Sequence, residues 1–265
     1  MLFGAGGYLG SALAAELDRR SLPWVRGGWR TLSLPSTATF VINAAAFIPP
    51  ASVALCDERP FDTLQGNLAL PATLTRLCRV AGVPLAHLST GCLWNDGQEH
   101  DEDSPIQRAF TGHCGFYVGI KALAEKEVRR HPSHYIWRVR LPFDEQAGPR
   151  NYLTKLATLP EVWMQENSVS HRADFARACL DLWQARALWG TYHVVNSGTL
   201  CAQNVAICLH ERGIRSDPPV FVDRQDGACR LSNAKLLAAG VKMRSVREAL
   251  DDALANWTTP PPNPT

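Results

Sequence analysis

The sequence has little net charge and no basic cluster. Its 27 Lys and Arg residues and 25 Asp and Glu residues give a formal net charge of +2, and the basic residues are scattered along the chain. A large charge of one sign is what attracts a protein to nucleic acid or to an acidic membrane surface. The composition therefore favours neither of these partners.

Metal-binding and membrane-spanning patterns are also missing. The eight cysteines include no Cys-x-x-Cys pair, so we expect no zinc site. The longest apolar stretch, FVINAAAFIPPASVAL, is interrupted by Asn43 and two prolines. The first ten residues are glycine-rich and lack the basic start of a secretory signal. We therefore expect a cytoplasmic protein with reduced thiols.

The chain opens with a pattern typical of dinucleotide binding. In MLFGAGGYLGSALAAEL, a short apolar strand precedes Gly4, Gly7 and Gly10, and leucines at helical spacing follow. Such glycines permit a tight turn and a close approach of the backbone to a pyrophosphate. The helix would begin at Tyr8 and Leu9, whose N–H groups would face the phosphates.

The segment after the second predicted strand lacks acidic residues. No Asp or Glu occurs between Leu22 and Val41, whereas Arg26 and Arg30 do occur there. A carboxylate at this place suits a ribose 2′-hydroxyl, and arginine suits a 2′-phosphate. We therefore expect NADPH as the cofactor, with NADH as the alternative.

Short apolar segments alternate with helical patterns along the chain. The strand candidates are PWVRG, TFVINAAA, PLAHLST, HYIWRVRLP and TYHVVNS, and helical patterns lie between several of them. This alternation predicts an α/β fold with a Rossmann-type doubly wound parallel sheet and a smaller C-terminal substrate lobe.

After residue 145 the sequence becomes more loop-like and polar, which suggests where the domains divide. We expect an NADP-binding Rossmann domain over residues 1–144, to which residues 167–188 return. Residues 145–166 and 189–258 would form the substrate-binding lobe. The proline-rich end, residues 259–265, is expected to be disordered.

Two residues spaced four apart point to acid–base chemistry. Tyr117 and Lys121 share one face of a predicted helix. An ammonium group nearby would lower the pKa of the phenol, so that it could give a proton to a carbonyl oxygen as hydride arrives at carbon. Thr90, at the end of the strand LAHLST, could hold the same oxygen. A Tyr-x-x-x-Lys spacing also arises by chance, and the glycine turn and the strand ends are what favour catalysis.

These motifs resemble a known enzyme class. The combination of GAGGYLG, NAA at Asn43–Ala45, ST at Ser89–Thr90 and the Tyr117/Lys121 pair resembles the extended short-chain dehydrogenases/reductases. Within that class, STGCLW, EDSP, FTGHCGFYVGIKALAE, RVRLPF and PRNYLTK resemble the dTDP-4-dehydrorhamnose reductase family, and closest the bifunctional 3,5-epimerase/4-reductases acting on UDP-4-keto-6-deoxyglucose.

The resemblance implies residue roles. Thr90, Tyr117 and Lys121 match the reductase triad, and Cys92 and Lys155 match the acid–base residues of the epimerising members. Arg30, Asn43, Ala44 and Ala45 match cofactor contacts. Substrate contacts are expected from Thr90, Gly91, Cys92, Asn151, Asn167 and Ser168. Arg230 is a further candidate on chemical grounds, because a guanidinium can pair with the oxygens of a diphosphate. The partner would be a nucleotide-diphosphate sugar, and a homodimer is left open.

Other interpretations remain open at this point. Cys92 could be a small buried packing residue, which would leave a reductase without epimerase activity. Lys155 and Arg230 could be ordinary solvated residues. The segment from Arg30 to Ala38 is shorter than in the family, which mildly favours a third reading, a non-catalytic cofactor-binding regulatory subunit.

Overall fold

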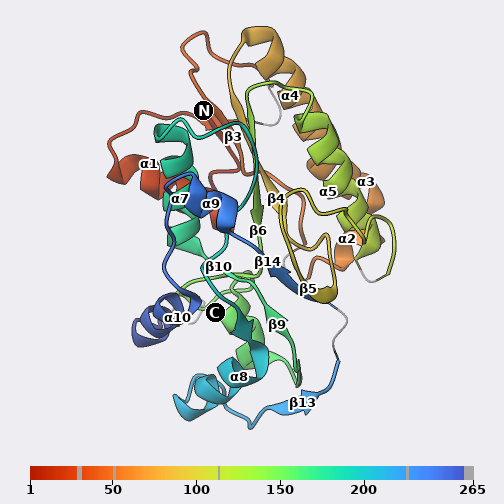
Figure 1. Ribbon diagram of the computed structural model, residues 1–265, viewed down its shortest axis with the longest axis vertical. Coiled ribbons are helices and arrows are strands. Elements are labelled where there is room, and N and C mark those ends of the chain that lie inside the picture. Colours follow the sequence, from red (N-terminus) through yellow and green to blue (C-terminus); the bar gives the residue numbers. More distant parts are fainter. Residues whose placement is uncertain (29–31, 50–51, 113, 225–226, 260–265) are drawn as a thin grey trace, which may run out of the picture.

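A computed structural model describes most of the chain and divides it into two lobes (Figure 1). Arg30 and residues 260–265 of the predicted tail lie outside the described residues. The described ranges are 1–28, 32–49, 52–112, 114–224 and 227–259.

The larger lobe is built on a six-stranded parallel sheet in the order β11-β6-β4-β3-β1-β2. All six residues of β4 are buried, as expected for a strand covered on both faces. This arrangement confirms the predicted Rossmann-type α/β fold. The strands of this sheet are β1 (Leu2–Phe3), β2 (Arg26–Gly27), β3 (Val41–Asn43), β4 (Leu85–Thr90), β6 (His134–Val139) and β11 (Gly190–His193).

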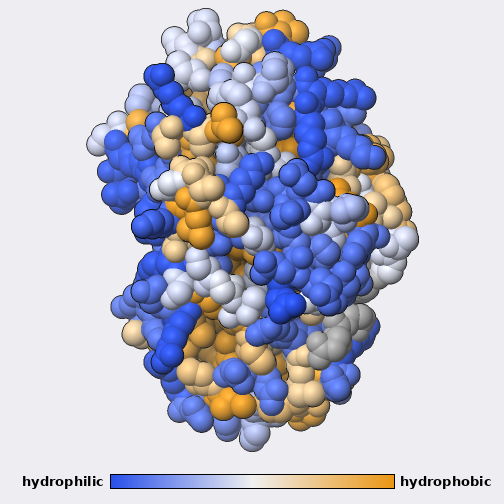
Figure 2. All heavy atoms as spheres, in the orientation of Figure 1, coloured by the Kyte–Doolittle hydropathy of each residue, from blue (hydrophilic) through white to orange (hydrophobic). Residues whose placement is uncertain are grey.

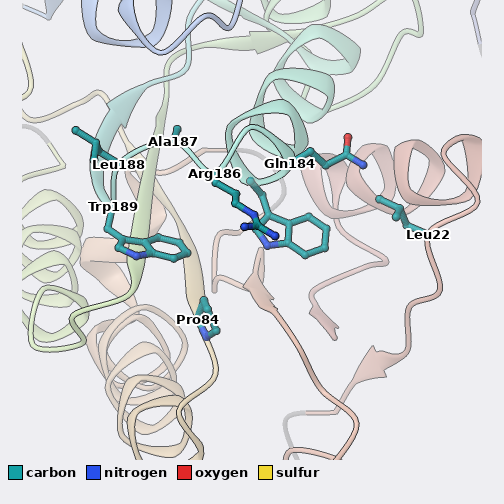
Figure 3. A pocket seen from close by; sticks show the side chains of 8 residues that line it. Leu22, Pro84, Gln184, Arg186, Ala187, Leu188 and Trp189 are labelled. Atoms are coloured by element: carbon teal, nitrogen blue, oxygen red, sulfur yellow. The ribbon is translucent and has the colours of Figure 1, made fainter.

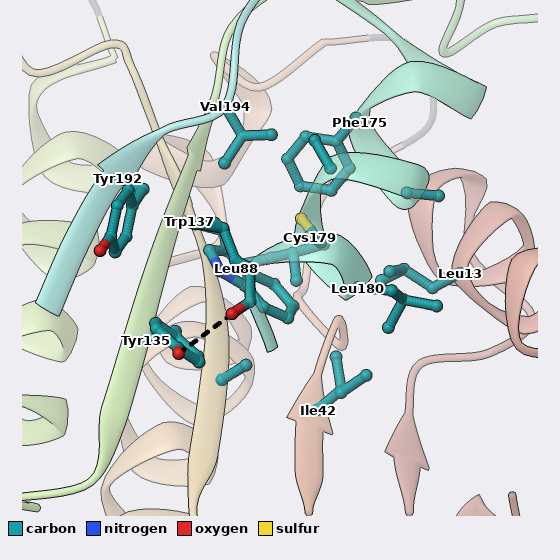
Figure 4. Packing of buried hydrophobic residues seen from close by; sticks show 14 of the residues in the cluster. Leu13, Ile42, Leu88, Tyr135, Trp137, Phe175, Cys179, Leu180, Tyr192 and Val194 are labelled. Carbon is teal, nitrogen blue, oxygen red and sulfur yellow. Dashed lines mark hydrogen bonds between the residues drawn. The ribbon is translucent and has the colours of Figure 1, made fainter. Parts of the chain in front are cut away.

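Helices cover both faces of this sheet. The pair α1 and α7 packs on one face, where Leu13, Trp137 and Phe175 belong to one buried hydrophobic cluster (Figure 4). Helices α4 and α5 pack together on the other face. The helices of the larger lobe are α1 (Tyr8–Arg19), α2 (Leu55–Glu58), α3 (Pro60–Leu64), the π-helix η1 (Gln65–Ala69), α4 (Leu70–Ala81), α5 (Gly115–Val128), α7 (Arg172–Gln184) and α9 (Ala234–Ala238).

The smaller lobe lies beyond the carboxyl ends of the main strands (Figure 1). A four-stranded sheet in the order β12-β9-β14-β5 joins it to the larger lobe, and two short two-stranded sheets, β10-β7 and β13-β8, complete the structure. The remaining elements are β5 (Asp96–His100), β7 (Pro142–Phe143), α6 (Tyr152–Thr158), β8 (Glu161–Trp163), β9 (Glu166–Asn167), β10 (Ser170–His171), β12 (Leu200–Cys201), α8 (Ala202–Glu211), β13 (Val220–Val222), β14 (Ala228–Leu231) and α10 (Val246–Ala255).

Each lobe contains segments that the sequence assigned to the other lobe. Residues 189–258 were expected in the substrate lobe, but β11 pairs with β6 in the main sheet, and α9 packs on β11. Conversely, β5, from the expected cofactor domain, pairs with β14. Local hydrophobic patterns do not reveal such pairings because they join segments far apart in sequence. Between β2 and β3, the described residues contain no helix.

The face in Figure 2 is mainly hydrophilic, with hydrophobic residues in several separate patches. Within the described ranges, no helix is long and apolar enough to cross a bilayer.

Candidate active site

The glycine turn after β1 is packed directly against the end of β3. Gly4 has a φ of +79°, and a Cβ there would lie 2.6 Å from the carbonyl carbon of Ala44 and 2.5 Å from the backbone nitrogen of Ala45. Only glycine combines this conformation with so close an approach. At Gly10, a Cβ would lie 1.9 Å from the Gly4 carbonyl oxygen. The turn therefore needs its glycines for geometric reasons.

Helix α1 starts at this turn with no side chain capping its first N–H groups. Gly7 is the N-cap residue, and Tyr8 and Leu9 form the first turn. The phenol oxygen of Tyr8 is buried without a hydrogen-bond partner among the described residues, and the Arg172 guanidinium lies 4.8 Å from its ring centre. The uncapped first turn of α1 suits an anionic ligand, whereas the Arg172 charge is already paired with Asp144 over 2.8 Å.

The end of β2 places a cation beside the turn. A guanidinium nitrogen of Arg26 would lie 3.4 Å from a Cβ at Gly6. In a Rossmann fold the 2′ position of the adenosine ribose meets this strand end. The residues present therefore fit an NADP-type dinucleotide. The other arginine expected here, Arg30, lies outside the described residues.

Tyr117 and Lys121 both lie in α5 and are almost completely buried. The sequence predicted a lowered pKa for Tyr117, but the net shift in the structure is upward. Burial and the charges of Cys92 and Cys56 raise the pKa of Tyr117, while hydrogen bonding with Thr90 partly opposes them. Burial also lowers the pKa of Lys121 to about 8.

A chain of hydrogen bonds connects Lys121 to residues of the main sheet. Its Nζ donates to the Leu88 carbonyl oxygen over 2.8 Å and lies 3.1 Å from Nε2 of His87. The amide nitrogen of Asn43 lies 3.1 Å from Nδ1 of the same ring, and Asn43 Oδ1 accepts the Ala45 N–H. Burial, and then the Lys121 charge, lower the pKa of His87 well below its usual value, so the ring is neutral.

A cavity of about 580 Å³ lies between the two lobes beside Tyr117. Both the reductase candidate Tyr117 and the epimerase candidate Cys92 line it. Its polar and aromatic lining residues are Cys92, Asn95, Arg108, Cys114, Tyr117, Arg140, Tyr152, Glu161, Trp163, Gln165, Asn167 and Arg224.

Cys92 stands next to a buried cation. A guanidinium nitrogen of Arg140 donates to Cys92 Sγ over 2.8 Å, and the Cys92 backbone N–H donates to Thr90 Oγ1 over 3.1 Å. Burial by itself would raise the pKa of the thiol. The charge of Arg140 and hydrogen bonding with Thr90 outweigh burial, and the net pKa is lowered. These contacts therefore favour the thiolate form of Cys92.

Lys155 lies in α6, between two residues that line the cavity, Tyr152 and Leu156. Burial and then the charge of Arg150 lower the pKa of Lys155, and the charge of Cys92 opposes this shift. The predicted epimerase pair is therefore close enough to interact electrostatically, although Lys155 itself does not line the cavity.

Of the other predicted substrate residues, Asn167 lines the cavity and accepts a hydrogen bond from Arg140. Asn151 instead caps α6, with its amide bonded to Asp144 and Gln146. The Ser168 hydroxyl bonds to the Leu231 backbone. These two side chains hold the fold, and the structure does not place them against the cavity.

Gly91 and Arg230 also lie away from the cavity lining. Gly91 is buried, and a Cβ there would meet Leu231 at 2.5 Å. Arg230 points toward Glu166 at 3.8 Å. The lining arginines Arg108, Arg140 and Arg224 were missed, because isolated arginines carry no local signal. For Arg140, the quoted motif RVRLPF was a signal that could have been used.

A second hollow, of about 600 Å³, lies at the amino ends of the main strands. Figure 3 shows it between Pro84, which precedes β4, and Trp189, which precedes β11. Leu22, Trp183, Ala187 and Leu188 make its walls largely apolar. It contains no acid–base pair and lies far from the predicted catalytic residues.

The fold and site together define a class of protein. A Rossmann sheet with a glycine turn after β1, Thr90 at the end of β4, and Tyr117 and Lys121 on α5 is that of an oxidoreductase of the extended short-chain dehydrogenase/reductase class. The chain belongs to the family described as RmlD substrate binding domain, which it matches over residues 1–259. The resemblance noted from the sequence motifs is thereby confirmed.

Curated relatives come from Arabidopsis thaliana. A bifunctional dTDP-4-dehydrorhamnose 3,5-epimerase/dTDP-4-dehydrorhamnose reductase is 26% identical over 218 residues, which are 76% of this chain and 70% of that protein. A trifunctional UDP-glucose 4,6-dehydratase/UDP-4-keto-6-deoxy-D-glucose 3,5-epimerase/UDP-4-keto-L-rhamnose-reductase is 25% identical over 76% of this chain. That match spans only 32% of the trifunctional protein.

Solved structures share the fold at low sequence identity. A UDP-rhamnose synthase from Acanthamoeba polyphaga mimivirus has a TM-score of 0.81 and 16% identity, covering 96% of this chain and 98% of its own. A dTDP-4-dehydrorhamnose reductase from Bacillus anthracis, solved in complex with NADP, has a TM-score of 0.75 and 19% identity, covering 96% of both chains.

Proposed function

We propose that this protein is an NADPH-dependent sugar-nucleotide reductase that also epimerises its substrate. The substrate would be a 4-keto-6-deoxyhexose linked to UDP or dTDP, and the product a 6-deoxy-L-sugar nucleotide of the rhamnose type. The observation that carries this proposal is that Cys92 and Tyr117 line one cavity. The names of the Arabidopsis relatives support the same reaction class.

For the reduction, the chain supplies a proton donor and binding groups. NADPH, when bound, supplies the hydride. The glycine turn, the first N–H groups of α1 and Arg26 would hold the dinucleotide. Tyr117 keeps its proton because burial raises its pKa, so it can donate to the O4 oxygen as negative charge develops there. Thr90 would hold the same oxygen.

For the epimerisation, the ketone acidifies the protons on the flanking carbons. An enolate formed there is stabilised by the same donors that hold O4. Cys92, with its lowered pKa, would remove a proton from one face. Lys155, whose pKa is also lowered, would return one on the other face.

Two alternatives make different predictions. A reductase without epimerase activity would leave Cys92 idle, and solved relatives named only as reductases favour this reading. A regulatory subunit would bind the cofactor without turnover, and the helix-free connection between β2 and β3 in the described residues is what favours it.

The test is an incubation in deuterated water with NADPH and either UDP- or dTDP-4-keto-6-deoxyglucose. We expect NADPH oxidation, with deuterium at C3 and C5 of the product by NMR. Cys92→Ala should abolish exchange on at least one carbon, whereas Cys208→Ala, a half-buried thiol on α8 outside the cavity, should not.

The outcomes separate the alternatives. NADPH oxidation that appears only after a separate epimerase is added would establish the reductase without epimerase activity. Binding of NADPH with no oxidation of it by either substrate would favour the regulatory subunit.

A further inference from the structure

Arg140 is a buried cation, and its side-chain hydrogen bonds to the described residues reach no carboxylate. The residue is 6% exposed at the end of β6. Its guanidinium donates to Cys92 Sγ over 2.8 Å, to Asn167 Oδ1 over 2.7 Å and to the Gly227 carbonyl oxygen over 2.7 Å. Among the ion pairs of the described residues, none involves Arg140. Of these three acceptors, all among the described residues, two are neutral and Cys92 Sγ is the one that can ionise.

Burial of a guanidinium without a counterion is strongly unfavourable. Arginine cannot relieve the cost by losing its proton in the accessible pH range. The thiol in contact with it can become an anion by losing a proton. The ion pair Arg140–Cys92 is then the arrangement that satisfies both buried groups.

We infer that Arg140 holds Cys92 as a thiolate in the protein before substrate binds, and that Arg140 is thereby the positioning residue for the proposed epimerase base. This inference rests on the proposed function for its catalytic meaning, although the thiolate itself can be tested without substrate.

A neighbouring thiol provides an internal contrast. Cys229, on β14, donates its own hydrogen to the Gly91 carbonyl oxygen over 3.3 Å. Burial raises the pKa of Cys229 to about 11, even though the charge of Arg140 opposes the shift. Cys92 instead accepts a hydrogen bond at Sγ. Both thiols are in this buried region, so burial does not explain why their pKa values shift in opposite directions. The difference is that Cys92 Sγ accepts a hydrogen bond from the guanidinium.

Two acceptors in the smaller lobe fix where the guanidinium points. Asn167 on β9 and Gly227 before β14 hold one nitrogen from the smaller lobe, while the other nitrogen reaches Cys92 after β4. The side chain therefore has little freedom to leave the sulfur. Among the described residues, the charged and titratable groups that interact electrostatically with Cys92 include Arg108, Cys114, Tyr117, Arg140, Lys155 and Cys229.

In the proton transfer, the carbon–hydrogen bond breaks and a sulfur–hydrogen bond forms. The electron pair of the broken bond moves to the carbonyl oxygen as an enolate, held by Tyr117 and Thr90. The thiolate becomes a neutral thiol, and the guanidinium loses its counterion while the negative charge lies on the enolate.

The first experiment titrates the thiolate by its ultraviolet absorbance, without substrate. The difference between wild type and Cys92→Ala isolates Cys92. We expect a step below a pH of about 7.5, in the range of cation-paired thiols. In Arg140→Met the step should move to about 8.5 or above, and in Arg140→Lys it should lie between the two. Arg247→Met, with a side chain 92% exposed on α10, is the control and should leave the step unchanged.

Two results would overturn the inference: a wild-type Cys92 that titrates like a free thiol, or an Arg140→Met variant that titrates like wild type. The first needs no Arg140 variant, so the test stands even if Arg140→Met fails to fold. Thermal melting of each variant checks folding.

The second experiment separates this inference from the proposed function. In deuterated water, Arg140→Met should lower deuterium incorporation roughly 100-fold, the usual size of an acid–base contribution. Reduction of a substrate already epimerised should lose less in kcat, with any loss of binding appearing in KM. Wild type that forms the thiolate but exchanges no deuterium would refute the epimerase function alone. Undiminished exchange in Arg140→Met would refute the role of Arg140 alone.

Discussion

Nζ of Lys121 lies 3.1 Å from Nε2 of His87. Which of these two nitrogens donates the hydrogen is decided by Asn43, which contacts the other side of the His87 ring. Because Asn43 Oδ1 accepts the Ala45 N–H, the Asn43 amide nitrogen must face His87 Nδ1. Nδ1 is then an acceptor, so in the neutral ring Nε2 carries the hydrogen. Nε2 of His87 therefore donates its hydrogen to Nζ of Lys121. Nζ can accept it only if it has a lone pair, so the contact favours the neutral amine form of Lys121.

This polarity predicts a pH effect of His87→Phe. The phenyl ring keeps the volume but removes the donor that stabilises the neutral amine, so the pKa of Lys121 should rise from about 8. The limb of the pH–rate profile of NADPH oxidation that reports Lys121 should move to higher pH. Profiles of kcat for wild type and variant measure this. A limb that stays in place, in a variant with an unchanged melting temperature, would remove His87 from this role.

Gly4→Ala tests the turn that packs against β3. The added Cβ would meet the Ala44 and Ala45 backbone at 2.5–2.7 Å, at a φ of +79°. Overpacking and left-handed strain together should cost about 2–4 kcal/mol, and NADPH binding should weaken. Gly28→Ala is the control, since nothing lies within 4 Å of its Cβ position. Urea unfolding and NADPH titration compare the two, and equal stability of both variants would contradict the prediction.

Arg26→Ala tests the choice of cofactor. Loss of a charge-assisted contact to a 2′-phosphate costs about 1.5–3 kcal/mol, or roughly 10- to 100-fold in the Kd for NADPH. The Kd for NADH should stay the same, because NADH has no 2′-phosphate. Titration by fluorescence measures both. If both constants change equally, Arg26 contributes to general binding and not to selection of NADPH.

Glu125→Gln tests a buried ion pair that supports β4, the strand that ends at Thr90. The Glu125 carboxylate accepts hydrogen bonds from Ser89 on β4 and from Arg138 on β6, and both Glu125 and Arg138 are almost fully buried. Leaving Arg138 buried without its partner should cost about 3–5 kcal/mol of unfolding free energy. Glu127→Gln, which removes the more exposed pair with Arg130, should cost at most about 1 kcal/mol.

The same carboxylate predicts an acid dependence of stability. Burial alone would raise the pKa of Glu125, but Arg138 and Ser89 lower it overall. A lowered folded-state pKa means that the stabilisation is present above the unfolded-state value of about 4.3 and is lost as the pH falls through the folded-state value. Urea unfolding at a series of acidic pH values should show wild type losing this contribution and Glu125→Gln lacking it throughout.

The sequence by itself determined the elements whose signals are local. The glycine turn, the Tyr117/Lys121 spacing on one helix and the strand that ends at Thr90 can be recognised because backbone conformation and helical periodicity depend on residues close in sequence. These features were enough to predict the class of fold.

The tertiary structure alone decided which distant residues meet. It brought Arg140 to Cys92 across 48 positions of sequence and His87 to Lys121 across 34. It also assigned Asn151 to a helix cap and put β11 in the main sheet. Burial and charge proximity set the pKa values of Tyr117, Lys121 and Cys92, and both exist only once the chain is packed. The physical reason is that contact, unlike periodicity, is a property of the whole fold.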